Sequence, residues 1–506
     1  MSQDIGPLIR SFYPHEEVII SYILDASDTS DIRSDDKKSD ETNFNLQDKE
    51  ENASIIKKTI TVKTYITGFN ILYDSDPMIQ VPFEYTDVPD EHMVYEKRRH
   101  RAYRNLLLRE LYKLLSEKTG RTLPWGILTG VRPTKLCFER LKNNTVGNIT
   151  YMTGEYLCSP KKAGLAQKVA AKELELLKKF DYNDGYSLYV GFPFCPSICN
   201  YCSFGSHPIE KYKDLVEDYI KALLHEIDGS CRFLPGKKLQ TVYFGGGTPT
   251  AVSAEQLQSV IKRVKESFDM SSVMEFTVEA GRPDSVDIEK LQMLKSEGIT
   301  RISINPQSMR QKTLNIIGRK HTAEQTIEAF KLARSVVFDN INMDLIAGLT
   351  GECFEDMKYT LDEVNKLSPD SITVHTLALK RAARLKTESE LYRGQEATDV
   401  PEMVEYAYDF CTKNGYEPYY LYRQKNMTEN LENIGYARPG KEGLYNILIM
   451  EEVQQILALG SGASSKFIDR NKTNGRRFGR IENVKNVGEY ITRIDEMIDR
   501  KREAYL

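Results

Sequence analysis

Three cysteines in one short stretch have the spacing in this chain that most clearly predicts chemistry. Cys195, Cys199 and Cys202 form a C-x3-C-x2-C pattern directly after an apolar run, 188–194, that is typical of a buried strand. Three thiolates on one loop can hold a single metal centre. Structural zinc sites normally have four protein ligands, with cysteines in two separated C-x2-C pairs, and two such pairs are absent from this sequence. The spacing favours a four-iron cluster with one iron left free for a substrate or cofactor, over three unrelated buried thiols.

Composition narrows the class of protein. The chain has 506 residues, enough for about two to four domains. Its 69 basic and 73 acidic residues give a net charge of −4, which lacks the basic character that usually accompanies nucleic-acid binding. The N-terminus lacks a secretory signal pattern, no apolar run reaches the roughly 18 residues of a membrane span, and the remaining cysteines are scattered singly, as in a reducing compartment. We therefore expect a cytoplasmic protein with no membrane span and no nucleic-acid partner.

The first third of the chain combines predicted strands with predicted helices. Segments rich in β-branched and aromatic residues predict a small sheet with strands at 14–24, 59–72 and 78–85. Residues 25–58 are dense in charged and polar side chains, which predicts a flexible surface insertion. Apolar periodicity predicts helices at 90–118 and 159–180. A basic cluster at 97–104 could bind carboxylates of a partner or substrate, but we favour a solvated helix face.

Strand-like and helical stretches alternate through the middle of the chain. The six apolar runs are 188–194, 239–244, 275–279, 301–304, 341–347 and 371–377. This alternation predicts parallel βα units. Six units are too few for an eight-stranded barrel, so we expect an α/β fold with an open, partial (β/α)6 barrel. Functional groups should then gather at the C-terminal ends of the strands, where the βα loops lie.

A glycine-rich turn follows the second of these strands. Residues 245–250 read Gly-Gly-Gly-Thr-Pro-Thr. Glycine removes the side chains that keep a ligand from the backbone and allows positive φ, so several N–H and C=O groups can face one ligand. Because the turn comes one βα unit after the cysteine-bearing loop, we interpret it as a ligand contact rather than as a merely tight turn.

Polar side chains stand at the ends of the next strands. Glu279 ends the third strand, Asn305 and Gln307 follow the fourth, and Asp344 lies within the fifth. A carboxylate that emerges from an apolar strand needs a partner, which either a cationic or hydroxyl-rich ligand or a structural ion pair could supply. Amide and guanidinium donors, including Arg319, suit ribose, carboxylate or adenine recognition.

The cysteine motif resembles a known family signature. With Tyr201 in the aromatic position it reads C-x3-C-x-aromatic-C, similar to the radical S-adenosyl-L-methionine (SAM) superfamily. The longer stretch Leu-Tyr-Val-Gly-Phe-Pro-Phe-Cys at 188–195 resembles the oxygen-independent coproporphyrinogen III oxidase (coproporphyrinogen dehydrogenase) family, and the long N-terminal extension is similar to HemZ-type members. This resemblance implies a radical SAM partial barrel with a [4Fe-4S] iron-sulfur cluster and one or two bound SAM molecules.

The resemblance also implies roles for individual residues. Cys195, Cys199 and Cys202 would bind the cluster, and Tyr189 would join them at the catalytic centre as a group close to the cofactor. The SAM-contacting set would be Tyr189, Tyr201, Gly246, Gly247, Thr248, Glu279, Gln307, Arg319, Asp344 and Ala378. A late glycine turn at 457–465 resembles the family's C-terminal turn, which implies that Ala463 and Ser464 lie near the cofactor.

The reaction that the resemblance implies is oxidative decarboxylation of coproporphyrinogen III, or a close tetrapyrrole, to protoporphyrinogen IX in anaerobic heme biosynthesis. The co-products would be 5′-deoxyadenosine and methionine, the electron donor a flavodoxin or ferredoxin, and the protein a monomer. Gly191 and Phe204 depart from the family, because the best-known members carry a histidine and a fourth cysteine at these positions. Two alternatives therefore stay open: a heme-binding carrier (heme chaperone), and a radical SAM methyltransferase or cyclase with another substrate.

We expect three domains: an N-terminal α+β extension at 1–183, the radical SAM partial barrel at 184–385, and a small α-rich, substrate-covering C-terminal domain at 386–506. Basic residues that follow the sixth strand could pair with substrate propionates or form a solvated helical turn: Lys380, Arg381 and Arg384. Aromatic residues at 416–424 and 433–436 could line a pocket for a flat substrate, but we favour the core of the C-terminal domain.

Overall fold

The computed structural model describes residues 2–13, 18–24, 58–65, 67–85, 92–181, 184–202, 205–378, 397–423, 431–468 and 478–505. Contacts within the chain separate two compact units. The N-terminal unit comprises Met1–Val131 and Gly147–Gly164. The barrel unit comprises Arg132–Val146, Leu165–Met427 and Leu431–Leu506. The expected boundaries at residues 183 and 385 remain predictions.

The N-terminal unit contains a four-stranded sheet in the order β1-β2-β3-β4. Its strands are β1 (Val18–Leu24), β2 (Lys58–Tyr65), β3 (Gly68–Tyr73) and β4 (Ile79–Pro82). Strands β1 and β2 pair in parallel, and the remaining pairs are antiparallel. The prediction of one strand at 59–72 is wrong, because the chain reverses between Tyr65 and Gly68 to form a hairpin. The first arm is rich in β-branched residues and the second in aromatic and apolar residues, so the pattern did not indicate the turn.

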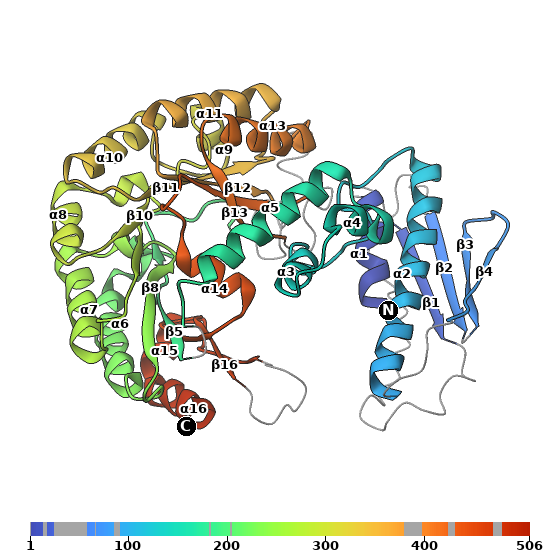
Figure 1. Cartoon of the computed structure of the whole chain (residues 1–506). Helices are drawn as coiled ribbons and strands as arrows, with labels where there is room; N and C mark the ends of the chain where they lie inside the picture. The colour runs from blue at the N-terminus through green and yellow to red at the C-terminus, as the bar shows by residue number, and fades with distance from the viewer. Residues whose placement is uncertain are drawn as a thin grey trace, which may run out of the picture. The chain divides into compact units, whose positions relative to one another are not determined.

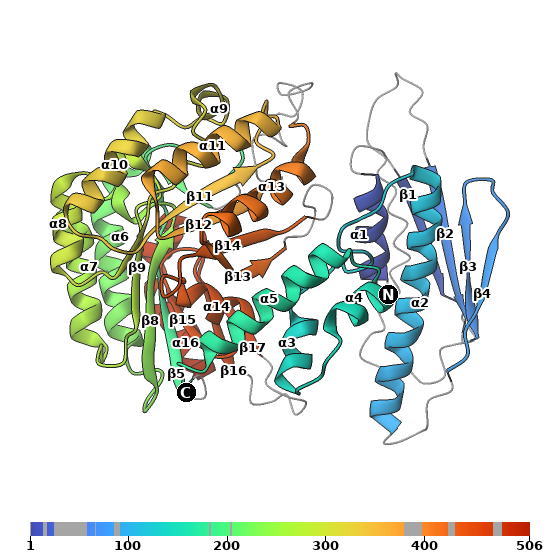
Figure 2. The ribbon, with the colours of Figure 1, turned by 45° about the horizontal axis from the view of Figure 1, so that its top comes forward.

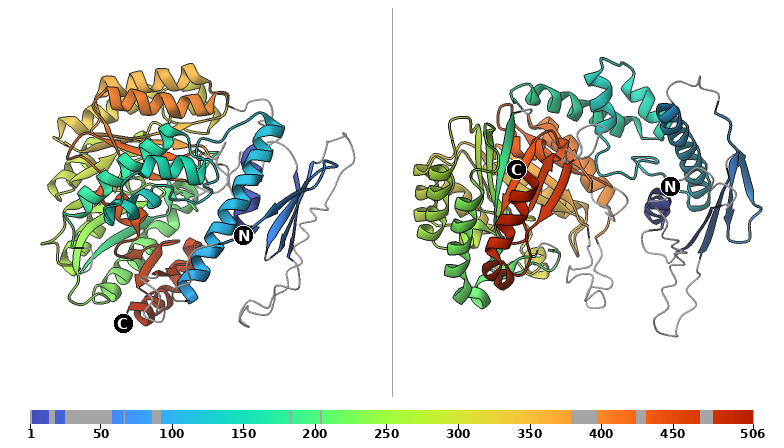
Figure 3. Two further views of the ribbon diagram at one scale, coloured as in Figure 1. Left: turned by 45° about the vertical axis from the view of Figure 1, so that its right-hand side comes forward. Right: turned by 90° about the horizontal axis from the view of Figure 1, so that it is seen from below.

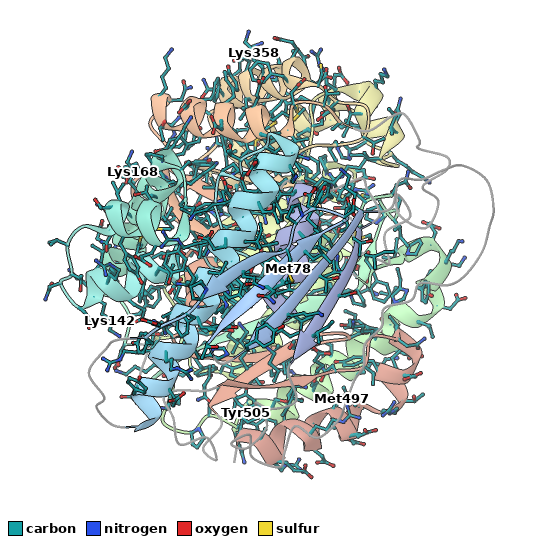
Figure 4. All side chains as sticks on the ribbon, turned by 90° about the vertical axis from the view of Figure 1, so that its right-hand side faces the viewer. Met78, Lys142, Lys168, Lys358, Met497 and Tyr505 are labelled. Atoms are coloured by element: carbon teal, nitrogen blue, oxygen red, sulfur yellow. The ribbon has the colours of Figure 1, made fainter. Side chains whose placement is uncertain are left out.

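Three helices complete this unit: α1 (Ser2–Phe12), α2 (His92–Thr119) and α4 (Asn148–Tyr156). An ion pair of 2.7 Å between Arg104 Nε and Asp4 Oδ2 joins α2 to α1. Helix α2 confirms the predicted helix at 90–118 within its described residues. Met78, just before β4, exposes 46% of its surface (Figure 4). The predicted insertion at 25–58 lies outside the described residues except for Lys58, which begins β2.

The barrel unit contains the six predicted parallel strands, adjacent in one sheet and in chain order. They are β5 (Gly185–Phe192), β8 (Lys238–Gly246), β9 (Glu275–Glu279), β10 (Arg301–Ser303), β11 (Ile341–Ala347) and β12 (Ser371–Thr376). Most residues of these strands are buried, including polar ones such as Glu275, Arg301 and Asn342. The expected α/β fold with six parallel βα strands is confirmed.

Helices cover the outer side of these strands (Figures 1 and 2). In chain order they are α6 (Ile209–Ser230), α7 (Ala254–Ser267), α8 (Ile288–Ser296), α9 (Gln311–Ile316), α10 (Ala323–Ser335) and α11 (Phe354–Leu367). Short 3₁₀ turns occur at Pro249–Ala251 and Pro283–Ser285, and two short strands, β6 (Phe194–Cys195) and β7 (His207–Pro208), pair with each other. Helix α5 (Pro160–Leu177) confirms the prediction at 159–180, and α3 (Lys135–Lys142) precedes it.

Strands from the last part of the chain extend the same sheet at both edges, giving eleven strands. Beside β12 lie β14 (Asn433–Ala437) and β13 (Glu417–Tyr422), both antiparallel. Beside β5 lies β15 (Gln455–Leu459) in parallel, followed by β16 (Ser464–Ile468) and β17 (Phe478–Glu482). These strands make the part of the chain after residue 385 continuous with the barrel sheet.

The described residues of this last part include the helices α13 (Val400–Lys413), α14 (Leu444–Glu451), α15 (Val487–Thr492) and α16 (Ile494–Tyr505). Helix α16 packs against α6 (Figure 3). Tyr505 Oη, at the end of α16, donates hydrogen bonds to the carbonyl oxygens of Ile456 and Lys466 at 2.7 and 3.1 Å (Figure 4). The C-terminal helix is therefore tied to strands β15 and β16.

Within the part of the chain that the structure describes, no helix combines the length and the apolar character that a membrane crossing requires.

Candidate active site

The three cysteines lie on the loop that follows β5, as the sequence predicts. Cys195 and Cys199 are buried and Cys202 is half-buried. The amide of Cys202 donates to the carbonyl of Cys199 at 3.0 Å, which closes a turn between them. The loop is anchored through Asn200, whose backbone N–H donates to Ile317 O at 2.9 Å.

The glycine turn packs directly against this loop. The amides of Gly247 and Thr248 donate to the carbonyls of Phe192 and Phe194 at 2.6 and 2.7 Å. A Cβ on Gly247 would lie 2.5 Å from Phe194 O and 3.0 Å from Cys195 Sγ, so only glycine fits there. The Oγ1 of Thr248 lies 3.4 Å from Cys195 Sγ. Close approach of the backbone to the cysteine loop is thus one reason for the glycines.

A cavity of about 260 Å³ opens beside the glycine turn. Tyr189, Gly246, Gly247 and Ala463, four residues that the sequence analysis selected, contribute to its wall. Its other lining residues were not selected as ligand contacts: Gly191, Phe192, Pro193, Gly205, Ser206, Ser461, Gly462, Glu482 and Lys485. Among these, Glu482 and Lys485 bring charge to the cavity from a segment some 290 residues after the cysteines in the sequence, and no local pattern indicated them. We call this space the glycine cavity.

A stack of tyrosines adjoins the glycine cavity. The rings of Tyr189 and Tyr243, which are paired residues of β5 and β8, are stacked at 6.2 Å, and Tyr445 stacks on Tyr243 at 4.5 Å. Tyr445 stands at the start of α14, where the amides of Leu444 and Tyr445 donate to the Glu275 carboxylate at 2.7 and 3.1 Å. The sequence analysis missed Tyr243 and Tyr445; strand alternation in β8 could have indicated Tyr243.

Glu279 is held by this stack. Tyr243 Oη donates a 2.5 Å hydrogen bond to Glu279 Oε1. Burial raises the pKa of Glu279 to about 7, an effect that the Tyr243 hydrogen bond opposes and the negative charge of Asp344 reinforces. Burial likewise raises the pKa of Tyr189. Near neutral pH, Glu279 can therefore hold or release a proton at its carboxylate.

The predicted polar residues of the fourth and fifth strands meet one another. Arg319 Nη1 donates to Asn305 O at 2.5 Å, Asn305 Oδ1 accepts from the amide of Asp344 at 3.1 Å, and the amide of Gln307 donates to Asp344 O at 2.9 Å. Gln307 has a φ of 66°, a left-handed conformation that costs on the order of 1–2 kcal/mol in a non-glycine residue. Its buried side-chain oxygen has no hydrogen-bond partner among the described residues, so it is available to a ligand.

Asp344 is held in its charged form. Burial alone would raise its pKa, but His375, with Nε2 3.8 Å from Oδ2, and Asn342, which donates at 2.7 Å to Oδ1, lower the pKa of Asp344 overall. The pKa of Glu279 is thus raised and the pKa of its neighbour Asp344 is lowered.

Arg282 is a buried cation beside the cysteine loop that the sequence analysis did not single out. Its Nη1 donates to Ser197 O at 2.9 Å and lies 3.8 Å from Cys199 Sγ, and its Nη2 donates to Ser197 Oγ at 3.0 Å. An ion pair of 2.8 Å with Asp284 holds the guanidinium. The signal that could have found it is its place three residues after Glu279, in the third βα loop.

Some predicted residues stand apart from this cluster or outside the described residues. Ala378 lies two residues beyond β12 and is half-buried. Phe204, Lys380, Arg381 and Arg384 lie outside the described residues. Tyr201, by contrast, belongs to the cluster, because it shares a side-chain hydrogen bond with Arg319 and packs against the buried Leu314, Ile317, Ile346 and Leu349.

The residues present fit a cluster and SAM in their chemistry. Among the described residues, no three Cys, His, Asp or Glu side chains form a group that could hold a metal ion. In a four-iron cluster each cysteine binds a different iron atom, so the three thiols need not converge on one ion. The donor set itself suits the group: three thiols on one loop, a cavity with the backbone of Gly246 and Gly247 in its wall, and a Gln307 oxygen with no partner among the described residues.

Comparisons with known proteins identify the family of this chain. The Radical SAM superfamily pattern matches residues 189–364. The oxygen-independent coproporphyrinogen-III oxidase-like protein HemZ of Bacillus subtilis (strain 168) is 41% identical over 412 residues, which are 80% of this chain and 82% of that protein. The chain belongs to the HemZ family of radical SAM proteins. Membership of the radical SAM superfamily implies a [4Fe-4S] cluster and SAM as cofactors.

Two further proteins show weaker similarity to this HemZ-family chain. The heme chaperone HemW of Lactococcus lactis subsp. lactis (strain IL1403) is 30% identical over 280 residues, 55% of this chain and 69% of that protein. The crystal structure of coproporphyrinogen III oxidase (HemN) from Escherichia coli superposes with a TM-score of 0.51 at 22% identity, covering 64% of this chain and 72% of that chain. This second likeness shows that the radical SAM fold is shared.

Proposed function

We propose that this HemZ-family protein is a radical SAM enzyme that converts coproporphyrinogen III to protoporphyrinogen IX in anaerobic heme biosynthesis. The observation that carries the proposal is a cavity lined by Tyr189, the glycine turn and residues on both sides of the cysteine motif, with Thr248 of the turn 3.4 Å from Cys195 Sγ. The similarity to a protein named as coproporphyrinogen-III oxidase-like supports the choice of substrate.

The proposed reaction balances as follows. Each of two propionate side chains loses one β-hydrogen atom, one electron and carbon dioxide, and becomes a vinyl group. The hydrogen atom goes to 5′-deoxyadenosine, and one SAM is consumed per propionate with release of methionine. The cluster would supply the electron that cleaves SAM, and a reduced flavodoxin or ferredoxin would supply that electron to the protein. The electron lost by the substrate would pass to an oxidised flavodoxin or ferredoxin, which is a one-electron acceptor.

The chain's own residues would position these groups. Cys195, Cys199 and Cys202 would hold the cluster, and the backbone of Gly246 and Gly247 would face the SAM methionine moiety. The Gln307 side-chain oxygen, which has no partner among the described residues, would accept a hydrogen bond from SAM. Arg319 and Asp344 would bind charged or hydroxyl groups of SAM. One or two SAM molecules would occupy this region, Tyr201, Thr248, Glu279 and Ala378 completing the proposed contacts.

The test is anaerobic reconstitution with iron and sulfide, followed by incubation with a reductant, SAM and coproporphyrinogen III. We expect protoporphyrinogen, with about one 5′-deoxyadenosine per decarboxylation. Cys199→Ala should abolish SAM cleavage, whereas Cys353→Ala, at an exposed cysteine outside the motif, should leave it intact. Undiminished 5′-deoxyadenosine formation by Cys199→Ala would contradict the cluster assignment.

A second candidate function is that of a heme carrier, which the similarity to a heme chaperone favours. Phe204 at the position of a fourth cysteine is also consistent with it. The carrier would retain heme at about one equivalent per chain and would not turn over coproporphyrinogen III. Heme titration of the reconstituted protein beside the turnover assay separates the two functions.

A further inference from the structure

The turn after β15 forms one wall of the glycine cavity. Ser461, Gly462 and Ala463 line the cavity from this side. Gly460, which begins the turn, has a φ of 99°, and a Cβ there would lie 2.5 Å from Gly191 O. The turn thus rests on the backbone of β5, and a small movement of Gly460 would move the cavity wall. We call residues 460–463 the wall turn.

A buried carboxylate holds the amide of the wall turn. Glu226, on α6, is fully buried and accepts a 2.7 Å hydrogen bond from Gly460 N through Oε2. Tyr490 Oη donates to the same oxygen at 2.6 Å. Asn483 Nδ2 donates to Oε1 at 2.8 Å and to Gly460 O at 2.8 Å. Both the N–H and the C=O of Gly460 are therefore fixed by side chains outside the turn.

The charge of Glu226 is balanced by the last helix. Lys501, on α16, is fully buried, and its Nζ lies 2.6 Å from Glu226 Oε1. The same ammonium donates to Asn483 Oδ1 and, at 3.3 Å, to Met497 O. A buried ion pair is favourable only when its remaining hydrogen-bonding capacity is satisfied, and here it is. We call Glu226, Asn483, Tyr490 and Lys501 the Glu226 network.

Tyr219 provides a second link from the same helix. Its hydroxyl donates to Gly191 O at 2.7 Å and accepts from Ser461 N at 3.2 Å, so it joins β5 to the wall turn. Tyr219 and Glu226 are seven residues apart on α6, which places them on one face two turns apart. One helix face therefore holds both sides of the cavity, the β5 backbone and the wall turn.

We propose that the Glu226 network, with Tyr219, positions the wall turn and thereby sets the affinity of the glycine cavity for SAM. This inference rests on the proposed function in that it takes SAM as the occupant of the cavity. The network lies behind the cavity wall and touches no cavity occupant, so these are positioning residues. Their effect should appear in SAM binding rather than in the assembly of the cluster.

The first measurement uses no cofactor. In the full-length protein without cluster or SAM, the amides of Gly460 and Ser461 should exchange slowly with solvent deuterium, because Glu226 and Tyr219 accept their hydrogen bonds. Tyr219→Phe and the double variant Glu226→Gln/Lys501→Met should speed exchange in the peptide that contains 460–463. The double variant removes both charges together, which keeps an uncompensated buried charge from unfolding the protein.

The second measurement compares SAM affinity with maximal rate in the reconstituted protein. We expect both variants to weaken SAM binding, seen as a KM for SAM cleavage raised by about tenfold, the size expected for losing a hydrogen bond to a charged group. Cluster content and kcat at saturating SAM should stay close to those of the unaltered protein. Arg500→Gln, on the exposed side of α16 in a pair with Glu496, is the matched control and should change neither exchange nor KM.

Each outcome decides one of the two claims. Faster exchange at 460–463 with an unchanged KM for SAM would overturn the inference, as would lowered thermal stability with both readouts unchanged. An unaltered protein that carries a cluster but does not bind or cleave SAM would overturn the proposed function, and the exchange data would still report whether the network holds the wall turn.

Discussion

At the scale of single residues, the site is shaped by buried charges near the cysteine loop. Arg282 exposes only 3% of its surface and contacts both Ser197 and the Cys199 sulfur. A cation in such a position favours added negative charge on the sulfur-bound group and so favours its reduced state. The Ser197 contacts also restrain the loop between the first two cysteines.

Arg282→Gln should therefore make the cluster harder to reduce. A unit charge at about 6 Å in a medium of effective dielectric constant about 20 contributes about 3 kcal/mol, or about 120 mV for one electron. We expect the midpoint potential, measured by a redox titration followed by electron paramagnetic resonance, to fall by an amount of this order. Arg263→Gln, in a surface ion pair with Asp228, is the control. An unchanged potential in Arg282→Gln would leave Arg282 with a purely structural role.

The raised pKa of Glu279 should make the stability of the folded protein depend on pH. Its pKa is about 7 in the folded protein against an ordinary value of 4.5, so the folded state binds the proton more tightly. The resulting stabilisation amounts to about 3 kcal/mol at most. It is fully present below about pH 4.5 and is lost as the pH rises through about 7.

Glu279→Gln removes this dependence. The unaltered protein loses this stabilisation between about pH 4.5 and pH 8, whereas the variant does not. The free energy of unfolding of the variant minus that of the unaltered protein should therefore increase by up to about 3 kcal/mol over this range, as measured by urea denaturation at each pH. An equal difference between the two proteins at both pH values would show that Glu279 titrates at its ordinary pKa in the folded state.

At the scale of elements, the C-terminal ends of neighbouring strands bring the site together. Strand β5 leads into the cysteine loop, β8 into the glycine turn, and β9 ends at Glu279, and these three strands are adjacent in the sheet. The contact between loop and turn leaves no room for a side chain at Gly247.

Gly247→Ala should displace the cysteine loop, because its Cβ would clash with Phe194 O and press on Cys195 Sγ. After reconstitution, we expect the variant to contain less than about half of the normal iron and sulfide. Its rate of SAM cleavage should fall by at least the same factor as its iron content. Gly164→Ala, in helix α5 with open space around its Cβ, is the matched control and should stabilise the protein slightly, by up to about 1 kcal/mol. Normal iron content and SAM cleavage in Gly247→Ala would show that the loop adapts.

At the scale of the whole molecule, the last part of the chain completes the barrel sheet. Strand β15 pairs with β5. Helix α16 packs beside this part of the sheet and buries Met497, Lys501 and Tyr505. Ending the chain before residue 494 would leave Glu226 buried without its counter-ion.

We expect such a truncation to destabilise the barrel unit by at least about 3–5 kcal/mol, the usual effect of removing one partner of a buried ion pair. Thermal unfolding should shift down by well over 5 °C, on the order expected for a unit of this size. Arg502→Ala, in an exposed pair with Asp499, should shift it little. An equal melting temperature for the truncated protein would mean that α16 is not part of the cooperative unit.

The sequence by itself determined the features that depend on local pattern. The alternation of strand-like and helical stretches predicted β5, β8, β9, β10, β11 and β12, because parallel strands need a crossover between successive strands, usually a helix. The cysteine spacing and the glycine turn could be recognised because each lies within a few consecutive residues. The roles assigned to those residues stay predictions that the experiments above test.

Only the tertiary structure decided the contacts between distant parts of the chain. Arg282 meets Ser197 across 85 residues, and Lys501 meets Glu226 across 275. Nothing in the sequence near Lys501 distinguishes it from the solvated lysines and arginines of the same helix, because its partner is chosen by the packing of α16 on α6. The insertion of β15 beside β5 is decided in the same way, since strand pairing depends on which edge the rest of the fold leaves open.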